Sequence, residues 1–250
     1  MYVMGGDPDR QTSVEVAEAV LRGGADILEL GVPFSDPIAD GRSVQAAGVR
    51  ALKSGTRPTD VLRIASEVKE AHDVPVVLMT YFNPIFARGV SGFLDGARKS
   101  GVDGVIVPDL PLDEAGAFGK AARARGIDSV LLAAPTTTEE RMRRIVANTS
   151  GFLYLVSVLG VTGARRELEG STVELVKFAK GFCRGKVPLA VGFGISRPQH
   201  VKTVIQAGAD AAIVGSAVVD RVAQVGRGKR EVLDEIEGFV RSLKDAASVA

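Results

Sequence analysis

A short pattern recurs four times along the chain and constrains its fold more than any other feature. In each copy a helical segment ends at glycine, one apolar residue and Asp follow, and then comes an apolar run. The copies are "GADILEL" from Gly24, "GVDGVIV" from Gly101, "GIDSVLL" from Gly126 and "GADAAIV" from Gly208. The glycine predicts a left-handed helix C-cap, and the apolar run predicts a buried parallel strand. The chain is therefore built from repeated βα units.

Weaker copies of the same unit complete the series. Strands are expected near residues 2–5, 25–31, 75–79, 102–107, 128–132, 152–157, 187–191 and 210–214, and amphipathic segments such as "TEERMRRIVANT" predict helices between them. Eight strands alternating with helices favour an α/β fold of the (β/α)8 TIM barrel type over a doubly wound sheet. No linker divides the 250 residues, so we expect one barrel domain over 1–250.

Composition excludes several classes of function. Lys and Arg total 31 against 30 Asp and Glu, and the basic clusters "RMRRIVANTS" and "RGKR" are typical of solvent-facing helices, so we expect no nucleic-acid partner. No targeting segment or membrane-length apolar run is present, and Cys183 is the single cysteine; we expect a cytoplasmic protein without membrane association. His72 and His200 are expected at the surface, which leaves acid–base chemistry to carboxylates.

The segment "GADILELGVPFSDPIADG", residues 24–41, places a carboxylate inside an apolar strand. Side chains alternate along a strand, so Ile27 and Glu29 share one face while Leu28 and Leu30 share the other. The leucines suit the interface with the outer helices, which directs Glu29 into the barrel. Burial there would raise its pKa, as a general acid requires. Pairing with a basic residue is the alternative, but the strand segments contain none.

Asp40 follows in a loop that Pro33 and Pro37 stiffen. In the barrel fold this loop lies at the mouth, where active sites form. A turn-forming Asp is equally compatible with the spacing, as it is for Asp36. The pairing of Asp40 with Glu29 at one mouth favours a catalytic function for Asp40.

Glycine-rich loops follow three consecutive strands: "GVTG" after the sixth, "GFG" after the seventh and "GS" after the eighth. Glycines allow backbone N–H groups to approach an anion, and a helix beginning at Ser216 would present its N-terminal dipole. Glycine is also needed for turns, but three adjacent loops at the expected end predict a phosphate site.

The segment "LELGVPFSDPIADG" resembles the signature of the tryptophan synthase α subunit family. "GGDPD", "MTYFNPIF", "GVDGVIVPDLP", "SVLGVTGAR", "VGFGIS" and "AIVGSAVV" also occur in the family's order, so the resemblance covers almost the whole chain. It implies a (β/α)8 lyase that cleaves indole-3-glycerol phosphate into indole and glyceraldehyde 3-phosphate by a retro-aldol reaction. No metal or organic cofactor is implied for this subunit.

The resemblance also implies residue roles. Glu29 matches the catalytic glutamate that protonates indole C3, and Asp40 matches the aspartate that stabilises positive charge at the ring nitrogen; ionised Glu29 is the economical base for the glycerol hydroxyl. Tyr154 matches a site tyrosine, with barrel packing as the alternative, and Tyr2, Tyr81 and Leu132 are either the indole slot or plain core. The remaining implied site residues are Thr162 in a lid loop and, around the phosphate, Gly163, Gly192, Phe193, Gly194, Gly215 and Ser216.

The family's partner is a β subunit that uses pyridoxal phosphate to join indole to serine, in an α2β2 assembly through which indole passes unreleased. Asp36 and Pro37 would face that partner, or form only a rigid turn, and Asp109 matches a position near the same face. Three positions depart from the family's usual residues: Met4, Arg42 and Leu159. None removes a catalytic group, but Arg42 and Leu159 bear on the flexibility of the two active-site loops.

Three rival functions remain open. The first is a free-standing indole-3-glycerol-phosphate lyase. The second is a weakly active barrel that binds phosphate to regulate a partner. The third is a phosphosugar isomerase or aldolase on the same fold. The last is disfavoured because the strands offer no lysine for a Schiff base and no histidine-rich metal site.

Overall fold

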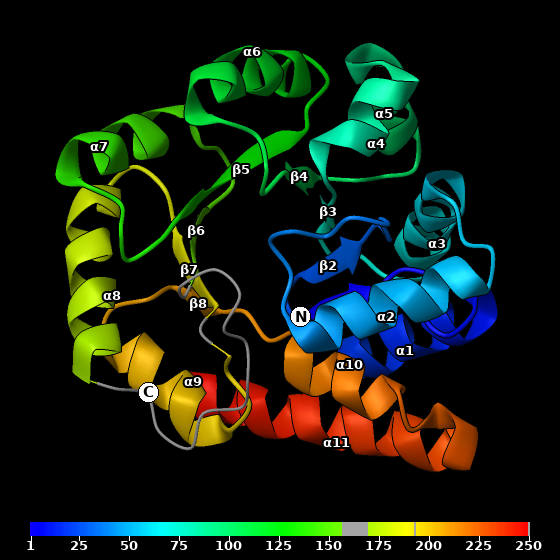
Figure 1. Cartoon of the computed structure of the whole chain (residues 1–250). Coiled ribbons are helices and arrows are strands. Elements are labelled where there is room, and N and C mark those ends of the chain that lie inside the picture. Colours follow the sequence, from blue (N-terminus) through cyan, green and yellow to red (C-terminus); the bar gives the residue numbers. More distant parts are fainter. Residues whose placement is uncertain (157–169, 193, 250) are drawn as a thin grey trace.

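The structure, a computed structural model, describes residues 1–156, 170–192 and 194–249. Eight strands follow one another around the centre in chain order, and helices surround them (Figure 1). Each strand pairs in parallel with the next. The strands are β1 (Tyr2–Met4), β2 (Leu28–Gly31), β3 (Val76–Met79), β4 (Gly104–Ile106), β5 (Asp128–Ala133), β6 (Leu153–Val156), β7 (Leu189–Gly192) and β8 (Ala211–Ala212).

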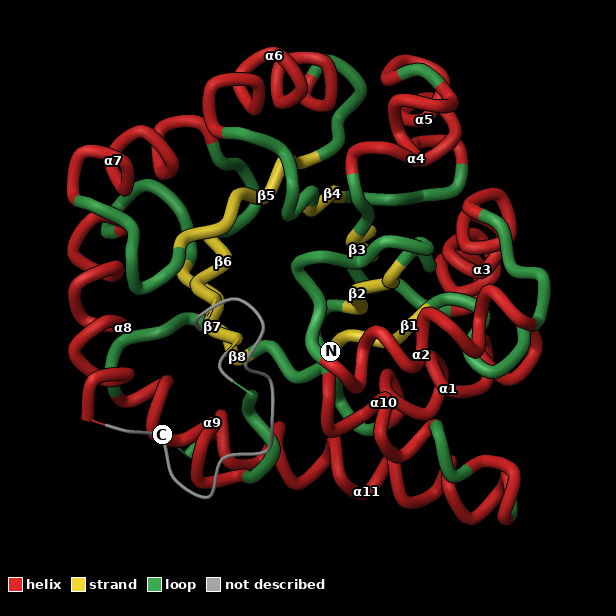
Figure 2. Tube along the Cα trace, viewed as in Figure 1, coloured by secondary structure: helices red, strands yellow, loops and turns green. Residues whose placement is uncertain are grey.

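The ring of strands closes between its first and last members. The backbone N–H of Tyr2 in β1 donates to the carbonyl of Val214, just beyond β8, at 2.9 Å. Figure 2 shows the strands as an inner ring inside an outer ring of helices. The prediction of a (β/α)8 barrel is confirmed, although most strands are shorter than expected because pairing ends before the apolar run does.

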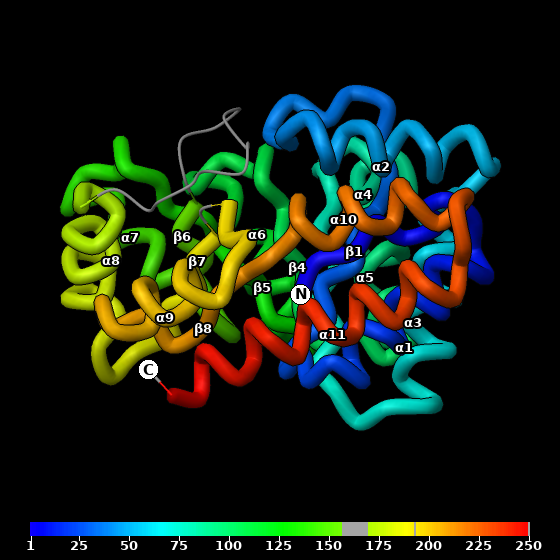
Figure 3. Tube along the Cα trace, turned by 90° about the horizontal axis from the view of Figure 1, so that it is seen from below, coloured from blue at the N-terminus to red at the C-terminus, as the bar shows by residue number. Residues whose placement is uncertain are grey.

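The helices occupy the predicted amphipathic segments and several further positions. They are α1 (Arg10–Arg22), α2 (Arg42–Lys53), α3 (Pro58–Ala71), α4 (Phe82–Arg88), α5 (Val90–Lys99), α6 (Leu112–Arg123), α7 (Glu139–Asn148), α8 (Gly170–Cys183), α9 (Pro198–Gln206), α10 (Ser216–Val222), the short 3-10 helix η1 (Val225–Arg227) and α11 (Lys229–Ser248). The last helix, α11, packs against α1 and α9, so the end of the chain covers the seam where the barrel closes (Figure 3).

The recurring glycine has the backbone conformation that the sequence pattern predicts. Gly24, Gly101, Gly126 and Gly208 have φ angles of +97°, +76°, +68° and +108°, in the left-handed region that glycine adopts without a steric cost. Each of these glycines turns the chain from a helix toward the next strand, so the pattern sets the start of every unit that contains it.

In two of the four copies of the pattern, the Asp that follows the glycine binds the backbone of the neighbouring strand. The Asp103 carboxylate accepts hydrogen bonds from the backbone N–H of Val76 at 2.8 Å and from Lys69 at 3.1 Å. Asp210 repeats the arrangement, accepting from the N–H of Leu189 at 2.7 Å and from the ammonium of Lys180. These carboxylates therefore hold the N-terminal ends of the strands in register.

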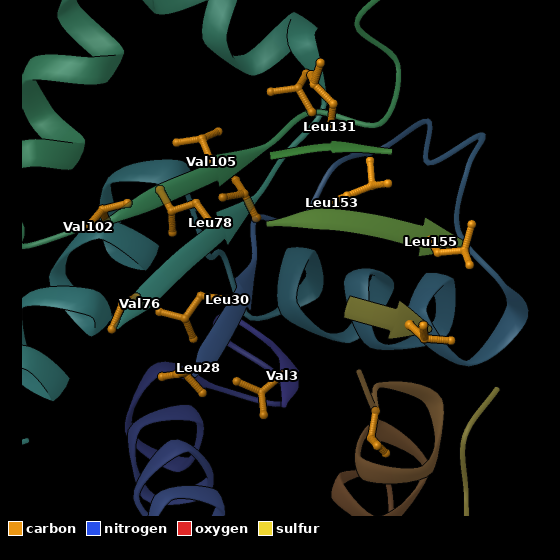
Figure 4. Packing of buried hydrophobic residues seen from close by; sticks show 14 of the residues in the cluster. Val3, Leu28, Leu30, Val76, Leu78, Val102, Val105, Leu131, Leu153 and Leu155 are labelled. Carbon is orange, nitrogen blue, oxygen red and sulfur yellow. The ribbon is translucent and has the colours of Figure 1, made fainter. Parts of the chain in front are cut away.

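The strands bury side chains on both faces. Leu28, Leu30 and Leu78 belong to the large cluster between the strands and the surrounding helices (Figure 4). On the opposite face, Val77, Ile106 and Val130 form a separate cluster within the barrel. The alternation places the leucines of β2 outward, as predicted, and leaves Glu29 facing inward.

Candidate functional site

A cavity of about 440 Å³ lies at the C-terminal ends of the strands. Most of the described residues that were predicted for the site line it: Tyr2, Glu29, Asp40, Leu132, Tyr154, Gly192, Gly194, Gly215 and Ser216. Thr162, Gly163 and Phe193, together with Leu159, lie outside the described residues. The barrel thus gathers side chains from strands and loops that are far apart in the chain.

Glu29 is the buried acid of this cavity. It sits level with Tyr2 on β1 and Val77 on β3, and only 5% of its surface is exposed. Among the described residues its Oε1 atom has no hydrogen-bond partner. Burial raises the pKa of Glu29 to about 7, against the lowering effect of the Met1 amino group and with a further increase from Asp40. At neutral pH Glu29 therefore holds a proton in a large part of the molecules.

Asp40 reaches the same cavity from the loop between β2 and α2. Burial raises its pKa to about 6, although a hydrogen bond from Tyr81 opposes the increase. The Tyr81 hydroxyl also accepts the backbone N–H of Ala39 at 2.9 Å, and its ring lies 5.3 Å from that of Phe34. The sequence leaves Tyr81 as either part of the indole slot or plain core. It is buried, it is not among the cavity-lining residues, and it fixes the loop that carries Asp40.

Two tyrosines form the inner wall and explain two of the nearby glycines. A Cβ atom at Gly192 would lie 2.7 Å from the ring of Tyr154, and one at Gly31 would overlap the ring of Tyr2. Burial raises the pKa of both tyrosines well above the ordinary value, and the charges of Glu29 and Asp40 add to the increase. Both hydroxyls remain protonated near neutral pH and can act as hydrogen-bond donors.

Residues of the predicted phosphate segments line this cavity. Gly194, Gly215 and Ser216 line it together, and Gly194 has a φ of +66°. Gly192 lines it too, but the close approach of Tyr154 is by itself a reason for a glycine there. The arrangement offers backbone N–H groups and one hydroxyl to an anion.

An ion pair between Asp7 and Arg50 connects helix α2, which follows the Asp40 loop, to helix α10. Asp7, from the "GGDPD" motif and only 2% exposed, accepts two hydrogen bonds from Arg50 of α2, at 2.7 and 2.6 Å. Arg50 also donates to the carbonyl of Val219 in α10 at 3.5 Å. Since α2 follows Asp40 and α10 begins at Ser216, the pair holds these two segments together.

The residues predicted to face a partner lie at one corner of the mouth. Asp36 is exposed and accepts a hydrogen bond from Ser35 at 2.5 Å, and Pro37 follows it. Asp109 accepts the backbone N–H of Phe82 at 2.8 Å and so holds the first residue of α4. Because Tyr81 immediately precedes α4 and binds Ala39, the loop with Asp36, helix α4 and Asp109 form one connected surface.

Two large apolar side chains are exposed on these same elements. Ile38, in the Asp36 loop, is 81% exposed, and Phe86, in α4, is 71% exposed. Large exposed apolar side chains can mark interaction surfaces on folded proteins. The positions that depart from the family's usual residues differ in burial: Met4 is in the core beneath the mouth, whereas Arg42 is exposed at the start of α2.

Several residues that line the cavity are not predicted from the sequence, Arg141 among them, and one side chain expected at the surface is buried. Arg141 of the "RMRR" cluster lines the cavity instead of belonging only to a solvent-facing helix surface. Its position in the first turn of α7, the helix that follows β5, is the sequence feature that could have indicated this place. His200 was expected at the surface but is buried, and its Nδ1 atom accepts the Ser196 N–H at 3.4 Å, because the start of α9 turns inward.

A second cavity, of about 610 Å³, lies toward the N-terminal ends of the strands and is lined mainly by apolar residues such as Ile27, Phe152 and Ala190. Glu29 borders both cavities.

In the described part of the chain, no group of three or more His, Cys, Asp or Glu residues is arranged to hold a metal ion. None of the described helices is both long and apolar enough to cross a membrane.

Known proteins match the chain over nearly its whole length. The family described as tryptophan synthase alpha chain matches residues 1–248. The tryptophan synthase alpha chain of Prochlorococcus marinus (strain MIT 9313) is 50% identical over 246 residues, covering 98% of this chain and 88% of the relative. That of Methanoregula boonei is 44% identical over 247 residues, covering 98% and 92%.

Solved structures agree with the sequence relatives. The tryptophan synthase A-subunit of the hyperthermophile Pyrococcus furiosus is 42% identical, with a TM-score of 0.88 over 98% of this chain and 96% of the other. A chain of the tryptophan synthase complex from the same organism is 40% identical, with a TM-score of 0.87 over the same shares. With a match of this length, identity and structural similarity, the chain belongs to the tryptophan synthase alpha chain family.

Proposed function

We propose that the barrel mouth cleaves indole-3-glycerol phosphate into indole and glyceraldehyde 3-phosphate. Family membership makes the chain an enzyme subunit of the lyase class in tryptophan biosynthesis; the specific reaction is the proposal. The observation that carries it is Glu29, a buried carboxylate with a pKa raised to about 7 and an unpartnered oxygen among the described residues. A carboxylic acid poised near neutral pH is suited to general acid catalysis.

The first step is protonation of the indole ring. Glu29 donates its proton to C3, which converts the ring into an indolenine that accepts electrons. The positive charge that develops at the ring nitrogen is stabilised by the carboxylate of Asp40 through a hydrogen bond from the N–H. Asp40 serves this role in its ionised form, which its pKa of about 6 allows at neutral pH.

The second step breaks the carbon–carbon bond. A base removes the proton of the glycerol hydroxyl, the oxygen electrons form the aldehyde carbonyl, and the bonding pair returns to the ring to give indole. Glu29, ionised by the first step, is the base at hand. Tyr154 lines the cavity with a protonated hydroxyl and orients either Glu29 or the glycerol moiety.

The glycine segments hold the phosphate. Gly194, Gly215 and Ser216 line the cavity, and we assign the same role to Gly163, Gly192 and Phe193 by family resemblance. Thr162 is assigned to the lid by the same resemblance, and Leu132 to the indole slot. The proposed steps use only carboxylates and backbone or hydroxyl donors, so we propose that this subunit works without a cofactor.

We propose that the indole passes to a β subunit carrying pyridoxal phosphate, in an α2β2 assembly. The support is the corner formed by Asp36, Pro37 and Asp109, where Ile38 and Phe86 expose large apolar surfaces. A related chain from Pyrococcus furiosus belongs to a tryptophan synthase complex. The same corner touches Tyr81 and hence Asp40, which gives a partner a physical route to the site.

The test is indole release from indole-3-glycerol phosphate by the purified chain, with and without an added β subunit. We expect slow cleavage by the chain alone, faster cleavage with the partner, and none by Glu29→Gln in either case. Cleavage that the partner leaves unchanged would favour a free-standing lyase. Tight substrate binding without cleavage under any condition would replace the proposal with a regulatory barrel.

A further inference from the structure

Helix α7 carries a cluster of three arginines, of which two are engaged on the outer surface. Arg143 pairs with Glu139 at 2.9 Å, one helical turn away. Arg144 pairs with Asp113 at the start of α6. Arg141 forms no ion pair within the described residues, so the members of the cluster are not equivalent.

Arg141 lies at the mouth of the barrel. It lines the cavity that contains Glu29 and Asp40, and it is the one basic side chain among the described residues of that lining. Its backbone N–H donates to the hydroxyl of Thr138 at 3.3 Å, which caps the helix and fixes the first turn. The backbone from which the guanidinium extends is therefore fixed by a defined helix start.

This position is electrostatically unfavourable for the helix. The N-terminus of a helix carries partial positive charge, which favours acidic residues and disfavours cations. Glu139 and Glu140 in the first turn satisfy that preference, whereas Arg141 opposes it. Arg141 is exposed at the rim and has no ion-pair partner within the described chain, so its charge is free to meet an anionic ligand that enters the cavity.

The cavity contains little positive charge to attract a phosphate. The proposed substrate carries a phosphate, but the carboxylates of the site, Glu29 and Asp40, are negative when ionised and so repel it. The glycine segments supply neutral N–H donors, and Ser216 supplies a hydroxyl. A guanidinium matches phosphate in geometry and charge and forms stronger hydrogen bonds than neutral donors.

We propose that Arg141 pairs with the phosphate of the substrate and supplies the positive charge that draws the anion into the mouth. The inference rests on the proposed function, because that function identifies the phosphorylated substrate. Arg141 acts in binding and not in the proton transfers, so its loss affects substrate capture more than the chemical steps.

The experiment compares Arg141→Gln and Arg141→Lys with wild type, and uses Arg144→Gln as the matched control on the same helix. Steady-state cleavage gives kcat and KM at several salt concentrations. Calorimetry measures binding of glycerol 3-phosphate, which carries the anion, and of indole, which is neutral. Loss of one charge-assisted hydrogen bond predicts a roughly tenfold weaker capture of the anion.

We expect Arg141→Gln to raise KM and to weaken glycerol 3-phosphate binding by roughly tenfold, with kcat within about twofold. The salt dependence of kcat/KM should flatten because the attracting charge is gone. Arg141→Lys should recover part of the loss, and Arg144→Gln should match wild type.

Two results would overturn the assignment. One is an Arg141→Gln variant that equals wild type in KM, salt dependence and glycerol 3-phosphate binding. The other is an equal weakening of indole binding, which would indicate a general distortion of the mouth. Failure of wild type to cleave substrate would instead count against the proposed function, and the glycerol 3-phosphate titrations would still decide the role of Arg141.

Discussion

Carboxylates at the two ends of the strands differ in their surroundings and in the direction of their pKa shifts. At the N-terminal ends, Asp103 and Asp210 each bind a lysine and a backbone N–H, and the pKa of Asp210 is lowered by Lys180 and Leu189 against the effect of burial. At the mouth, Glu29 and Asp40 have raised pKa values because burial outweighs their polar contacts. The fold uses one chemical group for two purposes.

The difference lies in where cations are placed. Lysines accompany the carboxylates that hold strands in register, and the inward face of the strands around Glu29 offers none. The hydrogen bond from Lys180 favours the ionised form of Asp210, whereas burial favours the protonated form of Glu29, which can then transfer its proton.

The largest effect is expected from Glu29→Gln. Loss of a general acid predicts a fall in cleavage rate of about 10³-fold or more, with substrate binding preserved. The same change should remove a pH-dependent instability. Because the folded-state pKa is about 7 and the ordinary value is 4.5, wild-type stability falls as pH rises through this window, by on the order of 3 kcal/mol.

Urea unfolding of wild type and Glu29→Gln from pH 4.5 to 8 tests the second part. The variant should lose stability less steeply than wild type across that range. Parallel stability curves for the two proteins would show that Glu29 is not a buried acid, and a variant with normal turnover would sink the mechanism.

Asp40→Asn should have the next largest effect. An amide cannot stabilise the positive ring nitrogen as a carboxylate does, so we expect kcat to fall by roughly 10²-fold. The loss should appear in kcat more than in KM, since the charge develops after binding. Steady-state kinetics decides it, and a change confined to KM would make Asp40 a binding residue only.

The pH profile of wild-type kcat/KM should be a narrow bell. The rate rises through about 6 as Asp40 ionises and falls above about 7 as Glu29 loses its proton. One unit above the upper pKa the rate should be roughly tenfold lower. A flat profile between pH 5 and 9 would contradict the assignment of acid and counter-charge to these two carboxylates.

Tyr81→Phe should produce a smaller, more specific change. The hydrogen bond that Tyr81 donates lowers the pKa of Asp40, so its removal should move the acidic limb of the profile to higher pH. The alkaline limb, set by Glu29, should stay in place. Kinetics across the pH range distinguishes the outcomes; if both limbs shift together, Tyr81 acts on the whole mouth.

Asp210→Asn should leave the chemistry almost untouched. We expect cleavage within about twofold of wild type and a loss of roughly 1 kcal/mol in stability, from the weaker bonds to Lys180 and Leu189. Because the pKa of Asp210 is lowered, its stabilisation is present above the ordinary pKa of 3.8 and disappears as pH falls below it. A large loss of activity would erase the distinction between the two ends.

The sequence predicted the barrel because its signals are local. The left-handed glycines, such as Gly24 and Gly208, and the alternation that turns Glu29 inward depend only on neighbouring residues. The sequence leaves Tyr81 as either indole slot or core, because nothing local shows that its hydroxyl meets Ala39 and Asp40, 42 and 41 positions away. Arg141 was missed for the same reason, since a basic cluster does not show which member turns toward the mouth.

The hydrogen bond between Tyr2 and Val214 has a consequence for how the chain is made. These residues are the two edges of the ring, and 212 positions separate them. At the rates of protein synthesis, β1 must wait on the order of ten to forty seconds for its second neighbour. During that time it is an open strand edge, able to pair with another nascent chain. The first three residues of the barrel, and not its catalytic loops, are therefore where errors of assembly on the ribosome are expected to begin.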